Sequence, residues 1–242
     1  MKASDKQPVI YRDMGRMGYQ DAWDYQESLL AQNVRIKSEY RQSGREIDPM
    51  SLPTCHYLLF CEHPPVYTLG KSGKMEHLLM NEDELASRGI QFVKTNRGGD
   101  ITFHGLQQLV GYPILDLEKM YTDIGLYLRN VEEVIIRAIA EFGIVGGRSK
   151  GETGVWIDAD IPGRERKICA IGVRCSRWVT MHGFALNVNT DLDYFTGIVP
   201  CGITNKQVTS MQRETGAEVS LEMVKDAVKK QFEQVFHVAL MA

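Results

Sequence analysis

The chain has 242 residues, a net charge of −3, 43% hydrophobic residues and 24% charged residues, which suits a water-soluble globular protein with one substantial core or two small ones. Its acidic balance argues against nucleic acid as the main partner, because phosphate binding normally needs a basic excess. No apolar run approaches the roughly 20 residues that span a bilayer, and residues 1–6 lead into no apolar stretch of a secretory signal, so we expect a cytoplasmic protein that binds neither nucleic acid nor membrane.

The N-terminal quarter predicts two strands with a helix between them. Residues 8–12 predict the first strand, and residues 19–40 place apolar side chains at helical spacing. A polar loop with one glycine and two prolines follows at residues 43–53. Residues 57–61 form a continuous apolar run, which is typical of a strand buried on both faces.

The next stretch predicts shorter elements. Extended residues 66–69 precede a short helix that Asn81 caps, and residues 90–95 predict another strand. Residues 109–115 predict a further strand, in which Pro113 indicates either an edge position or the end of the strand.

The C-terminal half contains the clearest helix, which Thr122 caps and Gly143 closes, and a last helix at residues 220–238. Between the two helices lie four extended segments, the first two interpreted as a hairpin: residues 155–158, 167–173, 178–181 and 184–189. No repeat or clear linker divides the chain. We therefore expect an α/β (α+β) fold, one domain over residues 1–242, with helices packed on a mixed central sheet.

The cysteines fit neither a disulfide scaffold nor a zinc ribbon, because their number is odd, their spacing is wide and no Cys-x-x-Cys pair occurs. Cys55, Cys61, Cys169 and Cys175 are interpreted as buried small hydrophobic side chains. Four histidines without a distinctive context are interpreted as structural, namely His56, His63, His77 and His237.

A thiol and a glycine-rich run carry the functional argument. Cys201 stands between Pro200, which fixes φ before the thiol, and Gly202, which tolerates backbone angles forbidden to other residues. Such a bend presents the sulfur to a cavity. Residues 97–105, of sequence RGGDITFHG, offer backbone N–H groups for close approach to a ligand, with the imidazole of His104 near their end. A presented thiol, candidate bases and a close-approach loop together indicate covalent acyl chemistry.

Four segments in order resemble those of one family. They are residues 62–70 (EHPPVYTLG), residues 97–108, residues 167–173 (KICAIGV), and residues 182–202, which begin with HGFALNVN and end with PCG. Their order, identity and spacing resemble lipoyl(octanoyl) transferases, the enzymes that move an octanoyl group from acyl carrier protein to a lipoyl domain. The resemblance covers roughly residues 55–205.

The resemblance implies a fold shared with the catalytic domains of biotin and lipoate ligases. It implies that Cys201 is the acyl-carrying nucleophile and Lys167 its activating partner, with no metal and no cofactor. His104 and His182 are expected close to the reacting centre. The residues that it places along the substrate are Arg97, Gly98, Gly99, Asp100, Ile101, Thr102, Phe103, His104, Ala170, Ile171, Gly172, His182, Gly183, Phe184 and Ala185.

These residue types suit that reaction. A free thiol with a pKa near 8.5 is only slightly ionised at neutral pH, and a nearby lysine ammonium favours the thiolate. Attack on an acyl thioester exchanges one thioester for another, so no ATP is needed. Delivery to a lysine amine then forms an amide, with Lys167 expected as general base and backbone N–H groups near Gly172 or Gly183 expected to hold the oxyanion.

By the same resemblance, the donor is octanoyl-acyl carrier protein, and the acceptors are lipoyl domains of 2-oxoacid dehydrogenase E2 subunits and the glycine cleavage H protein. Residues 148–177 hold seven basic against four acidic residues, and we hypothesise that some arginines there, Arg164 and Arg166 among them, dock these acidic proteins. A solvated surface of mixed charge explains the same pattern.

One departure from the family concerns the glycine-rich run. Where the family usually reads His-Gly-Pro-Gly-Gln, this chain reads His104-Gly105-Leu106-Gln107-Gln108, so the resemblance does not give the shape of this loop. Other functions also stay open. They are an ATP-dependent lipoate or biotin-type protein ligase, which has no need of a cysteine at position 201, a non-catalytic acyl-carrier-binding protein, and a cysteine hydrolase.

Overall fold

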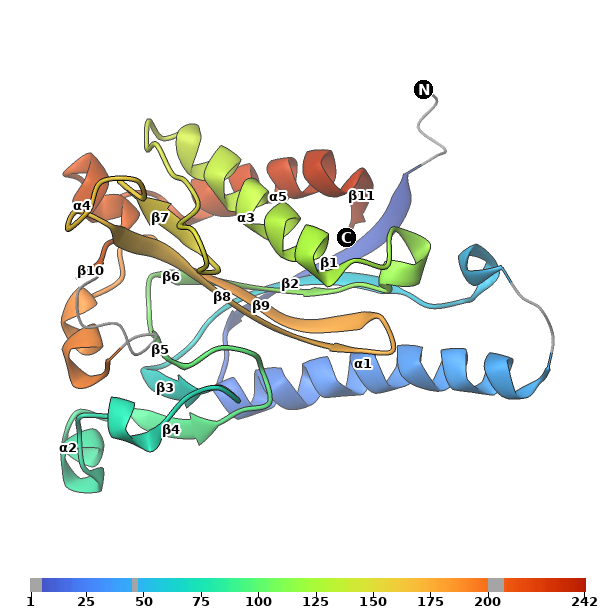
Figure 1. Ribbon diagram of the computed structural model, residues 1–242, viewed down its shortest axis with the longest axis horizontal. Helices are drawn as coiled ribbons and strands as arrows, with labels where there is room; N and C mark the ends of the chain where they lie inside the picture. Colours follow the sequence, from blue (N-terminus) through green and yellow to red (C-terminus); the bar gives the residue numbers. More distant parts are fainter. Residues whose placement is uncertain (1–5, 45–47, 200–206) are drawn as a thin grey trace.

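The computed structural model describes residues 6–44, 48–199 and 207–242, which form two sheets flanked by helices (Figure 1). The larger sheet has the strand order β10-β8-β9-β6-β2-β1-β11, with β7 paired to β8. Its strands are β1 (Gln7–Arg16), β2 (His56–Glu62), β6 (Gln108–Ile114), β7 (Val155–Ile157), β8 (Arg166–Ser176), β9 (Val179–Asn187), β10 (Gln207–Val208) and β11 (Val238–Met241). The smaller sheet has the order β4-β3-β5, with β3 (Val66–Leu69), β4 (Gln91–Lys94) and β5 (Ile101–His104).

The larger sheet is mixed, as the sequence predicts. Strand β1 runs parallel to both β2 and β11, and β10 runs parallel to β8. The central pairs β2–β6, β6–β9 and β8–β9 are antiparallel. The mixed α/β fold class is therefore confirmed.

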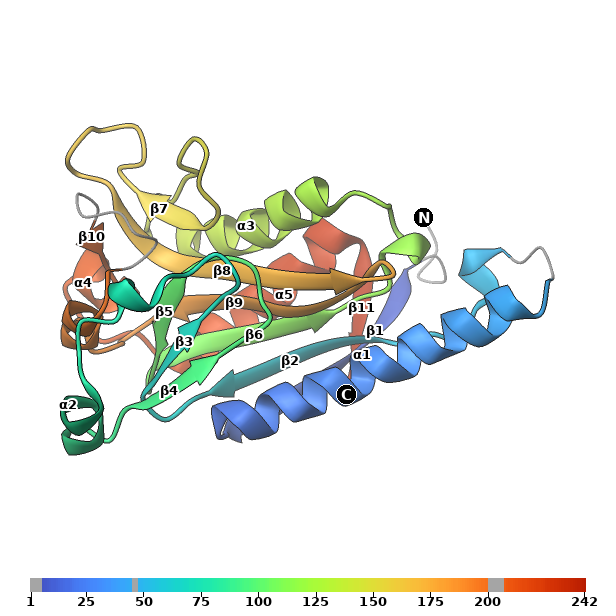
Figure 2. The same cartoon turned by 60° about the horizontal axis from the view of Figure 1, so that its bottom comes forward.

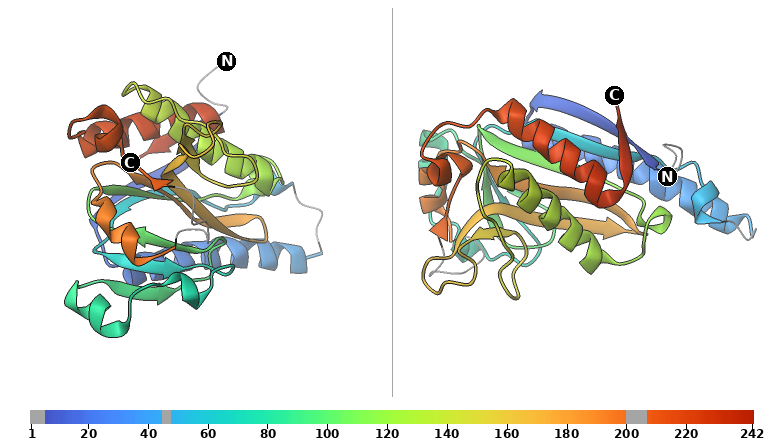
Figure 3. Two further views of the ribbon diagram at one scale, coloured as in Figure 1. Left: turned by 60° about the vertical axis from the view of Figure 1, so that its left-hand side comes forward. Right: turned by 90° about the horizontal axis from the view of Figure 1, so that it is seen from above.

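Helices cover both faces of the larger sheet (Figures 2 and 3). Helix α1 (Tyr19–Gln42) lies along one face, and α3 (Ile124–Ala140) and α5 (Leu221–Phe236) pack side by side on the other. The shorter helices are α2 (Glu82–Ser87) and α4 (Met211–Thr215), and 3-10 turns occur at η1 (Pro49–Ser51), η2 (Met75–His77), η3 (Leu117–Lys119) and η4 (Leu192–Gly197). No helix among the described residues is long and apolar enough to cross a membrane.

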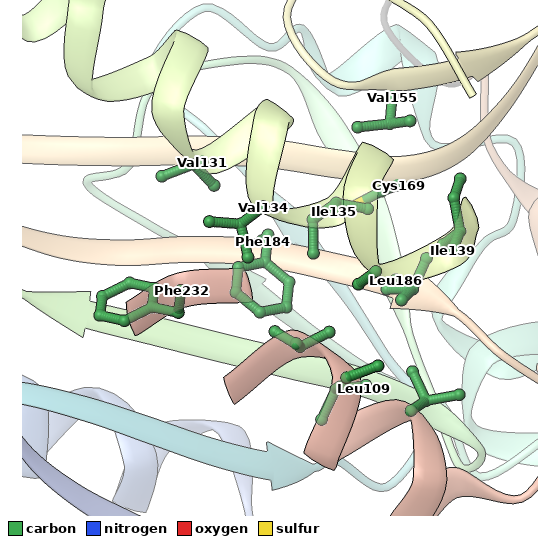
Figure 4. Packing of buried hydrophobic residues seen from close by; sticks show 14 of the residues in the cluster. Leu109, Val131, Val134, Ile135, Ile139, Val155, Cys169, Phe184, Leu186 and Phe232 are labelled. Atoms are coloured by element: carbon green, nitrogen blue, oxygen red, sulfur yellow. The ribbon is translucent and has the colours of Figure 1, made fainter. Parts of the chain in front are cut away.

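Two hydrophobic clusters fill the two sides of the sheet. Strand β2 contributes side chains to both clusters. Leu58 and Phe60 face α3 and α5. The alternate residues Tyr57, Leu59 and Cys61 face α1. This alternation explains why its sequence is apolar without a break. Figure 4 shows the α3 side, where Ile135 and Ile139 of the helix lie against Phe184 and Leu186 of β9.

Most predicted elements are confirmed, and the differences have local causes. Helix α3 starts at Ile124, and its N-cap is Asp123, whose carboxylate accepts a hydrogen bond from Leu126 N at 2.9 Å; the prediction of Thr122 as the cap is wrong. A carboxylate is a stronger hydrogen-bond acceptor than a hydroxyl, which favours aspartate over threonine as the cap.

Pro113 does not mark a sheet edge, since β6 lies between β2 and β9. It lies near the end of the strand, past Gly111, where the β6–β9 ladder stops. Thr180 replaces that ladder, because its hydroxyl donates to Pro113 O at 2.9 Å and accepts from Leu115 N at 3.0 Å. The alternative prediction, a strand end, is thus confirmed.

The segments predicted at 178–181 and 184–189 form one strand, β9. A two-residue turn of Arg177 and Trp178, with φ of 49° and 64°, joins it to β8. Both residues adopt the left-handed conformation that tight hairpins require, although neither is glycine or asparagine.

Candidate active site

A cavity of about 560 Å³ opens where strands β6, β8 and β9 of the larger sheet face β5 of the smaller one. The predicted site residues gather around it. Those that line it are Arg97, Gly98, Gly99, Asp100, Ile101, Thr102, His104, Lys167, Ala170, Ile171, Gly172, His182, Gly183, Phe184 and Ala185. The exception is Phe103, whose ring stacks on Tyr194 at 4.7 Å between centroids in the core of the smaller sheet.

Glycines in this wall allow two backbones to approach closely. A Cβ on Gly172 would lie 2.8 Å from Gly98 O, and one on Gly183 would lie 2.2 Å from Gly111 O. The N–H of Gly98 donates to Val173 O at 2.9 Å, so this amide serves the fold and is not available to a ligand. Glycine at position 172 therefore lets the loop 97–100 pack against β8, and glycine at position 183 lets β9 lie close to β6.

Arg97 holds the same loop against the smaller sheet. Its Nη2 donates to Thr68 O at 2.6 Å and to Thr68 Oγ1 at 2.9 Å, and its Nη1 donates to Gly98 O at 3.0 Å. The side chain is buried. The guanidinium thus places a fixed positive charge beside the cavity, where it disfavours protonation of the neighbouring imidazoles.

His104 lies in a directed row of hydrogen bonds along the cavity wall. The amide of Gln108 donates to Asn187 Oδ1 at 2.9 Å, which leaves Gln108 Oε1 to accept from His104 Nδ1 at 3.0 Å. His104 Nε2 then accepts from Thr68 Oγ1 at 3.3 Å. Burial, His63 and Arg97 hold the pKa of His104 well below its usual value. Both nitrogens are engaged and the ring is neutral, so His104 orients its neighbours and is a poor general base.

His182 lies on the same wall with a left-handed backbone, φ of 57°. Its Nε2 is 2.8 Å from Asn96 Oδ1, and Gln26 Oε1 accepts from its backbone N–H at 2.9 Å. Burial, with Arg97 and Arg174 nearby, lowers the pKa of His182 to about 3. This imidazole is also neutral at physiological pH.

The sequence predicts a structural role for His63, and the imidazole contacts Tyr112, a residue of the cavity wall. Its Nδ1 is 2.7 Å from Met17 O and its Nε2 is 2.7 Å from the hydroxyl of Tyr112, which lines the cavity. The carbonyl requires a donor, so Nδ1 carries the proton and Nε2 accepts from Tyr112. Burial lowers the pKa of His63 to about 4.

Tyr19 and Tyr112 are cavity residues that sequence reasoning missed. Tyr19 begins α1, and its ring stacks on His104 with 5.7 Å between centroids. Tyr112 reaches the cavity from β6. Neither lies in a distinctive sequence pattern, so only the strand register and the start of the helix bring them there.

Lys167 projects from β8 into the cavity wall, with Nζ 4.5 Å from the centre of the Trp156 ring. Glu152 and Thr153, from the loop before β7, line the cavity as well. Buried Glu132 holds that loop in place by accepting from Gly154 N at 3.0 Å.

Cys201 lies outside the described residues, as do its neighbours at 200–206. The chain on either side borders the cavity, because Phe195 and Val208 both line it. Val208 pairs with Lys167 in the parallel β10–β8 ladder. Upstream, Val199 N donates to His77 O at 2.8 Å, and His77 Nδ1 lies 2.6 Å from Asp100 Oδ2 in the glycine-rich loop.

None of the cysteines that the structure describes lines the cavity. Cys61 and Cys169 are buried, and burial raises the pKa of both thiols. Cys55 is partly buried. The prediction that all four are buried is wrong for Cys175, which is exposed near the tip of the β8–β9 hairpin.

The loop that departs from the family pattern keeps a tight turn. Gln107 has φ of 59°, a left-handed value, at the position where the family usually has glycine. Its N–H donates to Glu62 Oε2 at 2.7 Å, and its side-chain oxygen accepts from Asn189 Nδ2 at 2.9 Å. These bonds offset the strain of a non-glycine residue in this conformation.

The arginines proposed for docking are mostly engaged within the chain. Arg148 pairs with Glu132 and Glu133, and Arg174 pairs with Glu27. Arg166 binds Asp158 and Glu214, with its side chain 23% exposed. Arg164 is the more accessible of the two named candidates, at 68%.

Solved structures with the same fold are lipoate protein ligases. One, described as a bi-partite lipoate protein ligase and its E2 lipoyl domain from Thermoplasma acidophilum, matches with a TM-score of 0.69 and 19% identity, over 98% of this chain and 86% of that chain. Another, lipoate-protein ligase A bound with ATP, has a TM-score of 0.65 and 16% identity, over 98% and 89%. At these identities the likeness shows the fold alone.

Residues 18–233 match the family model described as the lipoyl protein ligase A/B catalytic domain, and the chain belongs to that family. Within that family the chain belongs to the octanoyltransferases, a group of acyltransferases. The octanoyltransferase of Christiangramia forsetii is 53% identical over 96% of this chain and 97% of the relative. That of Flavobacterium johnsoniae is 53% identical over 94% and 96%, and that of Cytophaga hutchinsonii is 51% identical over 98% and 96%.

Proposed function

We propose that the chain transfers an octanoyl group from octanoyl-acyl carrier protein to a lysine of a lipoyl domain, through a thioester on Cys201. The observation that carries the proposal is the position of Lys167, in the cavity wall and on the strand that pairs with the residues following the Cys201 segment. Two further observations support it: the glycine-rich loop borders the same cavity, and the described cysteines lie elsewhere.

In the first step, the thiolate of Cys201 attacks the carbonyl carbon of the donor thioester. A new C–S bond forms, the bond to the carrier sulfur breaks, and the released carrier sulfur takes up the proton that Cys201 lost. Lys167, as an ammonium, favours the attacking thiolate. Neither oxidation nor ATP enters this exchange.

In the second step, the lysine amine of the acceptor attacks the Cys201 thioester. The C–N bond of an amide forms and the C–S bond breaks. Lys167, neutral once its own proton has gone to the departing carrier sulfur, accepts the amine proton, and the ammonium and the Cys201 thiolate are restored. Backbone N–H groups near Gly172 or Gly183 are the proposed donors to the oxyanion.

The buried wall suits a hydrocarbon chain. Val110, Phe184 and Ala185 line it and are buried, and the two cavity histidines are uncharged. A volume of about 560 Å³ lies within the usual range for small-ligand sites. A medium-length acyl group therefore meets apolar surface and no unpaired imidazolium.

The proposed acceptors are lipoyl domains of 2-oxoacid dehydrogenase E2 subunits and the glycine cleavage H protein. Both sheets contribute to the cavity, which supports our inference that residues 1–242 form one catalytic domain. A cytoplasmic location, expected from the sequence, stays a prediction.

A paired assay tests the proposal. One arm holds octanoyl-acyl carrier protein and a lipoyl domain, and the other holds free octanoate, ATP and the same domain. We expect octanoyl-lipoyl domain in the first arm only. Product from the ATP arm alone would establish a ligase instead, and octanoate released to water in the first arm would establish a hydrolase.

Lys167→Ala should lower the rate of transfer in the first arm by about 100-fold or more, because it removes a proton-transferring group. Lys150→Ala is the matched control, since Lys150 is exposed and precedes the same strands. Equal rates for the two variants would remove Lys167 from the mechanism.

A further inference from the structure

We propose that Arg166, Thr209 and Glu214 form a clamp that positions Lys167 for acyl transfer. The inference rests on the proposed function, in which Lys167 acts at the reacting centre. It assigns Arg166 a role inside the enzyme, in place of the docking role that its charge suggests in the sequence.

The clamp begins with a bidentate ion pair. Arg166 Nε donates to Glu214 Oε1 at 2.7 Å, and Nη2 donates to Glu214 Oε2 at 2.6 Å. Its remaining nitrogen, Nη1, donates to Asp158 Oδ2. Paired donors on paired acceptors fix both distance and orientation, which a lysine at this position would not do. The pair joins strand β8 to helix α4 through two residues that are 48 positions apart in the sequence.

Thr209 closes the clamp into a ring. Its hydroxyl donates to Glu214 Oε1 at 2.5 Å, and its backbone N–H donates to Lys167 O at 2.9 Å. Arg166 and Lys167 are neighbours in β8, so the ring runs from Lys167 through Thr209 and Glu214 back to Arg166. Thr209 is fully buried. In a ring of charge-assisted bonds around a buried hydroxyl, losing one member leaves the others unsatisfied.

Thr209 also contacts β9, the strand that pairs with β8. Its carbonyl accepts from Asn187 Nδ2 at 2.9 Å, and Asn187 Oδ1 accepts from Gln108, the partner of His104. One residue thus fixes the backbone of Lys167 and anchors the row of hydrogen bonds that orients His104. A displacement of Thr209 would therefore disturb the positions of both Lys167 and His104.

Accessibility favours the clamp over docking for Arg166. Both carboxylates that it binds belong to this chain, and its side chain is 23% exposed, whereas its neighbour Arg164 is 68% exposed. A carrier protein would have to displace Glu214 to reach the guanidinium. The Arg166–Glu214 pair depresses the pKa of Glu214, so the carboxylate stays ionised across the working pH range.

Steady-state kinetics with octanoyl-acyl carrier protein and a lipoyl domain test the clamp. The variants are Arg166→Gln, Glu214→Gln, the double variant, Thr209→Val and Thr209→Ser, with rates expressed per folded enzyme. Arg137→Gln is the control, because the Arg137–Glu133 pair is an exposed ion pair on α3. Thr209→Val keeps shape and volume, so it reports on the clamp even where the charge variants fold poorly.

We expect kcat to fall by about 10-fold to 100-fold in Arg166→Gln and Glu214→Gln, with KM for the carrier nearly unchanged, because a small misplacement of a catalytic group costs this much. The double variant should be no worse than the poorer single variant, since both break one unit. Thr209→Val should lose about 10-fold in kcat and Thr209→Ser should restore it.

Unchanged kcat in folded Thr209→Val and Arg166→Gln overturns the clamp, and so does a raised KM with unchanged kcat, which would return Arg166 to a docking role. Failure of the clamp is distinguishable from failure of the proposed function. In the first case Lys167→Ala remains impaired while the clamp variants are active, and in the second Lys167→Ala itself is fully active.

Discussion

The side-chain oxygen of Gln108 and Nδ1 of His104 lie 3.0 Å apart. Because the NH2 group of Gln108 donates to Asn187, its oxygen faces His104 and can only accept, so Nδ1 of His104 carries the proton of this hydrogen bond. His104 is thereby fixed as a neutral imidazole protonated on Nδ1. Burial lowers its pKa, and it lowers the pKa of His56 to about 4, His63 to about 4 and His182 to about 3.

These histidines predict a loss of stability in mild acid. The unfolded chain takes up a proton on each histidine below about pH 6.5, and the folded chain does not, so the free energy of unfolding falls as the pH drops toward 4. At pH 5 each contributes a loss of about 2 kcal/mol. Urea unfolding at pH 7.5, 6 and 5 measures the slope.

A matched pair of variants tests whether the buried histidines cause this pH dependence of the free energy of unfolding. His104→Gln removes one of the buried titrating groups and should make the pH dependence shallower. His237→Asn should leave it unchanged, because His237 caps α5 in a left-handed conformation that asparagine tolerates and its ring is exposed. A stability that stays flat between pH 7.5 and 5 in the parent protein contradicts the neutral-histidine account.

At position 107 the glycine variant should be more stable than the alanine variant, which is the reverse of the usual order. Gln107→Ala loses the hydrogen bond with Asn189 but keeps the left-handed strain, and should destabilise by about 1 kcal/mol. Gln107→Gly loses the same bond and relieves the strain, so its free energy of unfolding should exceed that of the alanine variant.

Exposed Gln32 in α1 is the control for this comparison, since alanine should be more stable than glycine there by about 1 kcal/mol. Urea unfolding measures all four variants. If the alanine variant is more stable than the glycine variant at both positions, the turn at Gln107 is not strained.

Gly172→Ala should disturb the active site. The new Cβ would lie 2.8 Å from Gly98 O and 3.3 Å from atoms of Arg97, so the glycine-rich loop must move away from β8. We expect a stability cost of about 1–3 kcal/mol and a fall in kcat of about 10-fold or more. Gly147→Ala is the control, because its Cβ would meet only Ala159 at 3.8 Å. Equal transfer rates for the two variants would count against the close contact of loop and strand.

The rate of thiol labelling should differ among the cysteines according to their burial and pKa. Cys61 and Cys169 are buried with raised pKa values, so iodoacetamide should leave them unmodified in the folded protein. Cys201, if Lys167 activates it, should react first at pH 7, ahead of exposed Cys175, and peptide mass spectrometry identifies the modified residue. Faster labelling of Cys175 would argue against an activated Cys201.

Local signals in the sequence predict much of this fold. The capping box at Asn81 and Glu84, the apolar stripe of α3 and the two-sided burial of β2 are all properties of neighbouring residues. The sequence predicts the site segments 97–104, 167–173 and 182–185 because their chemistry is concentrated in short runs. Their gathering around one cavity then follows from the β8–β9 register, which places Gly172 opposite Gly183.

Features that depend on distant pairing were not predictable. Strand β11 exists because Val238 finds a partner in Gln7 of β1, at the other end of the chain. His63 and Thr209 look unremarkable in sequence, and their importance comes from contacts with Tyr112, 49 residues away, and with Lys167. Strand β5 was hidden because the glycines before it indicate a loop.

The central claim is that Cys201 carries the acyl group between donor and acceptor. Intact-mass measurement after incubation with octanoyl-acyl carrier protein, without acceptor, tests it most directly, using the parent protein, Cys201→Ala, and Cys175→Ala as the matched control. The account predicts one octanoyl adduct on the parent and on Cys175→Ala, lost when a lipoyl domain is added, and none on Cys201→Ala. An adduct of equal yield on Cys201→Ala, or full transfer by that variant, would contradict it.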